Sequence, residues 1–331
     1  MQSNRPTPVR SHRVRPAIVL FSVLALAACA SAGPPPGPYV PHDGLEGEGV
    51  LGSWVHSGGY RREYILSLPP DVAAEPEGTA ERSWPLLIVM HGAGATAAGL
   101  HRWIDPDSAT SAAGFIAVYP DGLDESWDLG CPACTSASMQ GVDDIQFVHT
   151  LIDHLADSLP IDTSRVVIAG HSLGAQFVHY YACESDRPPA AIAAFSGLWL
   201  RRTSSACTPR APVSVMMVHG DRDRILPWEG PRRNATALSM PIAWEGWNDL
   251  LQCPSDRRVT QRQDEAGDGT TVESWSVEGC DDGTSVELHR LRGAGHGWPG
   301  PVRPVPPLGP HTRNFDGLKE LLRFFSNRVA G

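Results

Sequence analysis

The sequence predicts an α/β fold, with helices on both faces of a central and mostly parallel β-sheet. Three observations support this. The expected strands are short and nearly all apolar, as strands buried on both faces are. They alternate with segments of helical periodicity. Several end in glycine-rich or acidic turns, which a parallel sheet collects at one edge. A chain of 331 residues can build one large domain or two small ones with a substantial core.

The two kinds of element follow one another from residue 60 to the end of the chain. The expected strands are 60–68, 86–90, 115–119, 166–169, 191–195, 213–218, 272–277 and 286–291. The expected helices are 101–113, 145–159, 175–181 and 314–329. The helix over 145–159 has the clearest pattern, because its apolar residues recur at i, i+3 and i+4 and Asp143-Asp144 precedes it as a cap.

The first 28 residues have the pattern of a secretory signal, with arginines followed by a short apolar run. Leu26-Ala27-Ala28-Cys29 also resembles a bacterial lipobox, in which cleavage leaves the cysteine lipidated. The alternative is an ordinary signal peptide cut after Ala30 or Ala32. We therefore expect an exported protein that is an outer-membrane or cell-surface lipoprotein attached through Cys29, or an extracellular protein if Cys29 is not lipidated.

Composition separates a tether from the folded part of the chain. Residues 29–49 are rich in proline and glycine and predict a tether, whereas residues 50–331 form the predicted domain. The formal net charge is −10 and the basic residues are scattered, which argues against nucleic acid as a partner. Nothing in the pattern predicts an oligomeric state.

Six cysteines remain after Cys29, an even number that predicts disulfides in an exported chain. Joining sequence neighbours favours the pairs Cys131–Cys134, Cys183–Cys207 and Cys253–Cys280, out of 15 possible connectivities. The Cys-Pro-Ala-Cys segment at 131–134 has two alternative interpretations, as a redox pair or as half of a zinc site. No second C-x-x-C accompanies it, so we expect a local staple, and we expect neither a metal site nor a cofactor.

A catalytic serine is predicted where an apolar strand turns sharply into a helix. Gly170-His171-Ser172-Leu173-Gly174 matches G-x-S-x-G, the pattern of a nucleophile elbow. The strained turn needs small neighbours, which Gly170 and Gly174 provide. With 33 glycines in the chain the pattern alone is weak evidence, and the strand before it and helix after it are what favour Ser172 as the nucleophile.

A serine nucleophile needs a base and a carboxylate that orients the base, and both are expected later in the chain. Asp223 follows the strand over 213–218 and is the expected carboxylate, whereas Asp221 is interpreted as a turn residue that bonds its own backbone. His296, in a glycine-rich loop after the strand over 286–291, is the expected base. Less suitable histidines stand within a strand (His289), in a proline-rich loop (His311), in a helix (His149 and His154), or where they would brace a turn (His91 and His219).

The edge of the sheet at which the parallel strands end should also provide an oxyanion hole and residues that contact the substrate. Two backbone N–H groups are needed, and Leu173 and Ala93 are the first choices, with Gly94 as the alternative to Ala93. Trp127 and Trp298, both expected on rim loops, are candidates to stack on a sugar or aromatic acyl group. The alternative for each tryptophan is ordinary packing.

With these motifs the chain resembles secreted esterases of the polyhydroxybutyrate depolymerase and feruloyl/acetylxylan esterase group, the carbohydrate esterase 1 type of α/β hydrolase. The resemblance runs from about residue 59 to residue 325. It depends on His91-Gly92, Tyr119-Pro120-Asp121-Gly122, Asp143-Asp144, the Ser172 elbow, His219-Gly220-x-x-Asp223 and Gly295-His296-Gly297-Trp298-Pro299-Gly300. Leu173 departs from a common asparagine and Ala93 from a frequent cysteine.

The resemblance implies that residues 50–331 are an α/β-hydrolase catalytic domain. By this likeness the domain is a serine esterase that acts through Ser172, Asp223 and His296 on polyhydroxybutyrate-type oligomers or on feruloyl or acetyl esters of polysaccharides. Two other functions fit parts of the pattern. One is a serine peptidase similar to prolyl oligopeptidase, and the other is a surface binding protein that has lost its catalysis.

Overall fold

The computed structural model of the protein describes residues 40–41, 49–74, 83–231 and 236–329. The predicted signal peptide, Cys29 and most of the predicted tether lie outside the described residues. Within the tether, Val40–Pro41 (β1) pairs with Leu51 and Gly52 of the next strand, so these two residues belong to the sheet. No helix among the described residues is long and apolar enough to cross a membrane.

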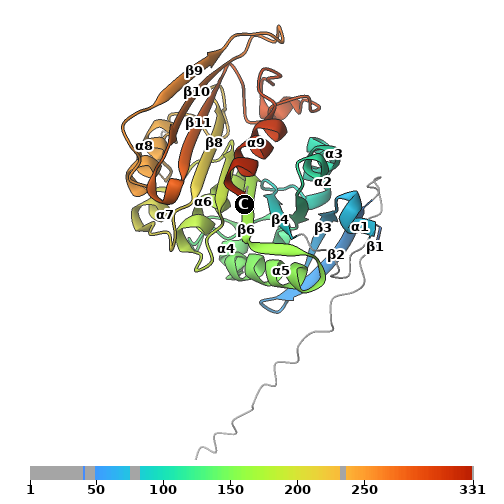
Figure 1. Ribbon diagram of the computed structural model, residues 1–331. Coiled ribbons are helices and arrows are strands. Elements are labelled where there is room, and N and C mark those ends of the chain that lie inside the picture. The colour runs from blue at the N-terminus through green and yellow to red at the C-terminus, as the bar shows by residue number, and fades with distance from the viewer. Residues whose placement is uncertain (1–39, 42–48, 75–82, 232–235, 330–331) are drawn as a thin grey trace, which may run out of the picture. The chain divides into compact units, whose positions relative to one another are not determined.

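One sheet passes through residues 40–292, with the strand order β1-β2-β3-β5-β4-β6-β7-β8-β11-β10-β9 (Figure 1). Six central strands, from β5 to β11 in this order, run parallel, and antiparallel strands flank them on both sides. The strands after β1 are β2 (Val50–Ser57), β3 (Tyr60–Ser67), β4 (Trp84–Met90), β5 (Ile116–Pro120), β6 (Ile161–His171), β7 (Ala191–Phe195), β8 (Ser214–Gly220), β9 (Arg258–Arg262), β10 (Thr271–Glu278) and β11 (Ser285–Arg292).

Helices cover both faces of this sheet. They are α1 (Pro70–Ala74), α2 (Ala97–Ile104), α3 (Asp107–Ala112), α4 (Ser136–Gln140), α5 (Asp144–Ser158), α6 (Leu173–Glu184), α7 (Arg201–Ala206), α8 (Met240–Leu250) and α9 (Gly317–Val329). The core divides into two clusters because neighbouring residues of a strand point to opposite faces. Ile168 belongs to the cluster that includes apolar residues of α5, α6 and α8, whereas Val167 and Ala169 belong to the cluster that includes residues of α2 and α9. The predicted parallel sheet with two covered faces is therefore confirmed.

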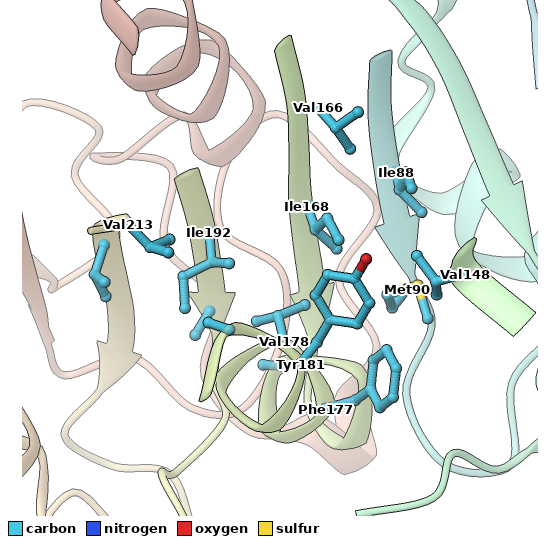
Figure 2. Packing of buried hydrophobic residues seen from close by; sticks show 14 of the residues in the cluster. Ile88, Met90, Val148, Val166, Ile168, Phe177, Val178, Tyr181, Ile192 and Val213 are labelled. Atoms are coloured by element: carbon cyan, nitrogen blue, oxygen red, sulfur yellow. The ribbon is translucent and has the colours of Figure 1, made fainter. Parts of the chain in front are cut away.

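The helix that follows Ser172 is anchored by the larger cluster (Figure 2). Phe177, Val178 and Tyr181 of α6 are fully buried beside Ile168 of β6 and Met90 of β4. Burying one such side chain contributes about 1.5–3 kcal/mol. Helix α6 is thereby held against the strands whose ends form the site described below.

The structure differs from the predicted elements where the apolar pattern is weak. Strand β2 was not expected, because serines and His56 interrupt it, yet it forms a hairpin with β3. Strand β9 was not expected either, because it is polar and exposed throughout. The helix expected over 101–113 is two helices, since Asp105 has a left-handed φ of 44° and Pro106 follows.

A buried ion pair joins β3 to α5. The Arg62 guanidinium donates to Asp144 Oδ1 at 2.7 Å, and both side chains are almost fully buried. Asp144 Oδ2 accepts the Asp128 N–H at 2.6 Å, so the carboxylate also holds the loop between β5 and α4. Burial nevertheless raises the pKa of Asp144, against the opposing effect of Arg62. Asp143, the exposed residue before it, is the N-cap and accepts the Gln146 N–H at 2.8 Å.

We expect Asp144→Ala to lower the free energy of unfolding by about 3–5 kcal/mol, because it leaves the Arg62 charge buried without its partner. Asp143→Ala is the matched control and should cost only about 1 kcal/mol, the usual effect of losing a cap. Urea unfolding followed by circular dichroism measures both values. Equal losses from the two substitutions would contradict the assignment of Asp144 as a buried partner of Arg62.

A second acidic network joins β11 to α9. Glu287 is 4% exposed and accepts from His289 at 3.0 Å and from Arg323, which also donates to Glu320 at 2.7 Å. Burial alone would raise the pKa of Glu287, but the hydrogen bonds from His289 and Arg323 lower it to about 2. A carboxyl group with a lowered pKa stabilises the fold above its unfolded pKa, and this contribution disappears as the pH falls toward the folded pKa.

The difference in unfolding free energy between wild type and Glu287→Gln should therefore shrink by about 2 kcal/mol between about pH 6 and about pH 3. Denaturant unfolding at a series of pH values measures this difference. Replacement of the exposed Glu184 by glutamine is the control and should give a difference that changes little with pH. A constant difference for Glu287→Gln would show that Glu287 has no lowered pKa.

Candidate active site

Ser172 occupies a strained turn between β6 and α6. Its φ of 55° and ψ of −114° lie in a region that L-residues rarely adopt. The flanking glycines are required by close backbone contacts. A Cβ on Gly170 would lie 2.3 Å from the Gly174 backbone, and one on Gly174 would lie 2.5 Å from the Met90 carbonyl oxygen. The predicted need for small neighbours is confirmed, and the turn directs Ser172 toward the open edge of the sheet.

Three side chains that are far apart in the sequence form one chain of hydrogen bonds. His296 Nε2 lies 2.8 Å from Ser172 Oγ, and His296 Nδ1 lies 2.6 Å from Asp223 Oδ2. Asp223 and His296 are buried, whereas Ser172 is partly exposed. The structure thus brings together the three residues that the sequence singled out. With Nδ1 donating to the carboxylate, Nε2 is oriented to accept the serine proton.

The Asp223 carboxylate is held by several donors. Its Oδ1 accepts the backbone N–H groups of Ile225 and Leu226, each at 2.8 Å, and the His219 ring nitrogen Nε2 lies 3.3 Å from Oδ2. Burial opposes the charge, but the hydrogen bonds from His219 and His296 hold the pKa of this carboxyl well below its usual value. The lowered pKa favours the ionised form of Asp223, which can stabilise a positive charge on His296.

Asp221 does not bond its own backbone as expected. Its Oδ1 accepts the Gly293 N–H at 2.7 Å and its Oδ2 accepts from Arg290 at 3.2 Å. The carboxylate therefore ties the end of β8 to the end of β11, where the loop that carries His296 begins. The expected Asx turn is replaced by a contact between strands, because the parallel pairing of β8 with β11 places Arg290 beside His219.

His171, the first variable residue of the elbow, positions His296. Its Nε2 donates to the His296 carbonyl oxygen at 2.8 Å. Burial, with a smaller contribution from the neighbouring His296, lowers the pKa of His171 to about 3, so the ring is neutral and keeps one donor. Sequence reasoning did not identify this role. The only signal for it was the place of a histidine directly before the serine.

The amides expected to form an oxyanion hole are available. Among the described residues, neither the Ala93 N–H nor the Leu173 N–H has a hydrogen-bond acceptor. The alternative donor, the Gly94 N–H, is already bonded to the Glu125 carbonyl oxygen at 3.0 Å. His91 braces this turn as predicted, because its Nδ1 donates to the Gly92 carbonyl oxygen at 2.8 Å and its Nε2 accepts the Gly122 N–H at 2.9 Å.

A cavity of about 840 Å³ opens over Ser172 and His296. Ala93 lines it, as does the partly exposed Trp103 of α2. Trp127 and Trp298 do not line it and are fully buried, so the expected stacking on substrate is wrong for both. Trp127 donates to the His91 carbonyl oxygen at 2.8 Å, and Trp298 stacks on Phe195 with ring centroids 4.1 Å apart. Both loops fold back onto the sheet, which sequence alone does not reveal.

The six described cysteines form the three predicted pairs, Cys131–Cys134, Cys183–Cys207 and Cys253–Cys280. The first closes the loop between β5 and α4 as a local staple. The second joins the end of α6 to the end of α7. Disulfides of this kind are typical of proteins that fold in an oxidising compartment.

Comparison with known families finds a match for the middle of the chain. Residues 133–242 match the phospholipase/carboxylesterase family. This segment contains Ser172 and Asp223, whereas His296 lies beyond it.

Curated relatives match a longer part of the chain. NocK of Nocardia uniformis subsp. tsuyamanensis, a protein named as an esterase, is 27% identical over 75% of this chain and 74% of its own length. The bifunctional acetylxylan esterase/xylanase XynS20E of Neocallimastix patriciarum is 28% identical over 72% of this chain, and feruloyl esterase B of Piromyces equi is 27% identical over 67%. The chain spans only 32% and 41% of these last two proteins.

Among solved structures, the acetyl xylan esterase of Aspergillus awamori aligns with a TM-score of 0.51 and 13% identity, over 80% of this chain and 93% of that one. At this identity the likeness concerns the fold. The chain has the α/β-hydrolase fold, as the sequence predicted.

The strain at Ser172 can be measured without an activity assay. We expect Ser172→Gly to be more stable than Ser172→Ala by about 1 kcal/mol, because glycine adopts a positive φ without steric cost. Ser205, on the exposed side of α7, should show the opposite order, with glycine less stable than alanine by up to about 1 kcal/mol. Thermal or urea unfolding measures the stability of the glycine and alanine variants at both positions. If Ser172→Gly is less stable than Ser172→Ala, this would argue against strain at the elbow.

Proposed function

We propose that this chain, a homologue of feruloyl and acetylxylan esterases with the α/β-hydrolase fold, is a serine hydrolase that cleaves carboxylic esters. The observation that carries the proposal is the continuous chain of hydrogen bonds from Asp223 through His296 to Ser172. It begins at a charged carboxylate and ends at a hydroxyl in a cavity, which is the arrangement that nucleophilic acyl transfer requires.

The proposed reaction has two steps. His296 Nε2 takes the proton from Ser172 Oγ as the oxygen attacks the ester carbonyl carbon, and Asp223 stabilises the imidazolium that forms. The Ala93 and Leu173 N–H groups donate to the oxyanion of the tetrahedral intermediate. His296 then protonates the departing alcohol, which leaves an acyl group on Ser172. The same imidazole deprotonates water, which attacks the acyl-enzyme. The bond from Ser172 Oγ to the acyl carbon then breaks, His296 returns the proton to Ser172 Oγ, and the acid is released.

The unbonded amides support this assignment of the oxyanion hole. An amide that already donates to a protein carbonyl, as that of Gly94 does, would have to break a bond before it could stabilise the intermediate. The Leu173 amide also begins α6, where the helix dipole favours negative charge. Gly92 keeps the turn with Ala93 close to the nucleophile, since a Cβ on it would lie 3.1 Å from the Cβ of Ser172.

The proposed substrates are esters of the kind that the relatives are named for, feruloyl esters and acetylxylan. Hydroxybutyrate oligomers are proposed as well, because the motifs of the sequence resemble those of polyhydroxybutyrate depolymerases. The cavity of about 840 Å³ has the size of a small-molecule site, for which volumes of about 300–1,000 Å³ are usual. We further propose that the protein is exported and attached to a membrane through a lipidated Cys29. The leader-like first 28 residues and the three disulfides support this location.

Purified protein should release p-nitrophenol from p-nitrophenyl acetate, and Ser172→Ala should reduce kcat to the background rate because it removes the hydroxyl that is hydrogen-bonded to His296. Methyl ferulate, an acetylated xylan oligomer, a hydroxybutyrate trimer and a peptide substrate, assayed side by side, rank the acyl groups. A fluorophosphonate probe should label wild type but spare Ser172→Ala. Equal inactivity of both proteins on every ester would refute the proposed function.

Substitution of the two aspartates that follow β8 should have very different effects on kcat. Asp223→Asn is expected to reduce kcat by about 10⁴, since it removes the charge that orients and stabilises His296. Asp221→Asn keeps its contact with the Gly293 N–H and is expected to reduce kcat by less than about tenfold. The matched amide substitutions make the comparison direct. A larger loss from Asp221→Asn would reverse the assignment of the orienting carboxylate.

A further inference from the structure

Two arginines line the cavity over Ser172 without any acidic partner. Arg102 belongs to the last turn of α2, and Arg303 belongs to the loop that follows Trp298. Both are exposed, and in the part of the chain that the structure describes neither forms an ion pair or a side-chain hydrogen bond. No aspartate or glutamate is among the described residues that line this cavity. The cavity wall therefore carries two uncompensated positive charges.

Trp103 brings the two arginines to the same wall. It follows Arg102 in α2, and its indole N–H donates to the Arg303 carbonyl oxygen at 2.9 Å. Its ring meets the His171 ring edge to face, with centroids 5.2 Å apart and planes at 86°. His171 in turn bonds the His296 backbone. The two cationic residues are thus connected through Trp103 to the residues that hold the proposed catalytic base.

A second cavity of about 670 Å³ lies beyond these residues and shares Arg102, Trp103 and Arg303 with the first. Among the described residues that line the two cavities, acidic side chains belong only to this far side, where Asp105 and Asp316 contribute to the lining. On the side of Ser172 the positive charge is unopposed. An anionic group would consequently bind between Ser172 and the boundary that the two arginines form.

This charge is unexpected for the chain as a whole. The protein has 37 acidic and 27 basic residues, so a cavity lined by two arginines and no acid has the opposite sign to the average surface. A cleft lined by charges of one sign concentrates ligands of the other sign. The planar guanidinium group also matches a carboxylate, which it binds through two parallel N–H donors. A wholly neutral ester would use neither property.

We propose that the preferred substrate is an ester that carries a carboxylate, which Arg102 and Arg303 bind while Ser172 attacks the ester carbonyl. This inference rests on the proposed esterase function and adds its substrate class. The carboxylate takes no part in bond breaking. Acyl transfer to Ser172 and hydrolysis proceed as described, and the arginines contribute affinity and orientation. Half esters of dicarboxylic acids and esters of carboxylated sugars or phenols belong to this class.

The test compares matched pairs of anionic and neutral esters. On the acyl side the pair is the mono-p-nitrophenyl ester of glutaric acid and p-nitrophenyl pentanoate. On the alcohol side the pair is para-acetoxybenzoate and its methyl ester. The selectivity is the kcat/KM for the anionic ester divided by that for the neutral ester. Each selectivity is expressed relative to wild type, which removes the intrinsic reactivity of the esters.

The double variant Arg102→Gln/Arg303→Gln should lower the selectivity at least about fivefold in one of the two pairs, because it removes two charge-assisted interactions that are partly screened by solvent. Arg210→Gln is the control. Arg210 is also exposed, forms no ion pair among the described residues and lies outside the cavity. It should leave the selectivity unchanged. The pair that responds identifies the side of the ester on which the carboxylate lies.

If the double variant lowers the selectivity by less than about fivefold in both pairs, and hydrolysis still depends on Ser172, the proposal of an anionic substrate is overturned and the esterase function is left intact. Hydrolysis that persists in Ser172→Ala, or wild-type protein that cleaves none of the four esters, overturns the proposed function and this inference with it.

Discussion

The structure depends on one backbone constraint, the positive φ of Ser172 at the junction of β6 and α6. A non-glycine residue in this conformation is unfavourable by about 1–3 kcal/mol. The surrounding structure holds it there. Helix α6 begins at the next residue and packs its aromatic face into the sheet, and the Ser172 N–H donates to the Phe195 carbonyl oxygen at 2.9 Å. Glycines 92, 170, 174 and 197 surround the turn because Cβ atoms there would collide with or crowd the elbow.

Buried histidines brace the loops around this turn. His91 holds the turn that contains Ala93, His171 holds the backbone of His296, and His219 donates to the Leu226 carbonyl oxygen at 2.7 Å in the loop after Asp223. Burial lowers the pKa values of His91 and His171, so they remain neutral donors. His296 differs in having a carboxylate on one ring nitrogen and a hydroxyl on the other. A histidine side chain can thus brace a loop or, as we propose for His296, act as a base, according to its partners.

Negative and positive charges lie in different parts of the site. The acidic group, Asp223, lies behind His296 and away from the cavity, where backbone N–H groups and histidines compensate it. The cavity itself carries positive charge at Arg102 and Arg303. An anionic substrate would therefore approach a positive wall without facing the carboxylate directly. The separation depends on the loop after β8, the loop after β11 and helix α2 after β4, which meet at the edge of the sheet.

The sequence by itself determined the parallel sheet, the elbow and the partners of Ser172. Apolar runs identify strands buried on both faces. Residues that follow the carboxyl ends of parallel strands lie at the same edge of the sheet, whatever the sequence of the remaining chain. The interrupted strand β2 and the exposed strand β9 escaped prediction because they are recognised only by the strands with which they pair. The burial of Trp127 and Trp298, the contact of Asp221 with Gly293 and the position of Arg102 and Arg303 on one cavity were likewise decided by the tertiary structure. These depend on how loops fold back across the sheet, and the free energy of such long-range packing is absent from any local stretch of sequence.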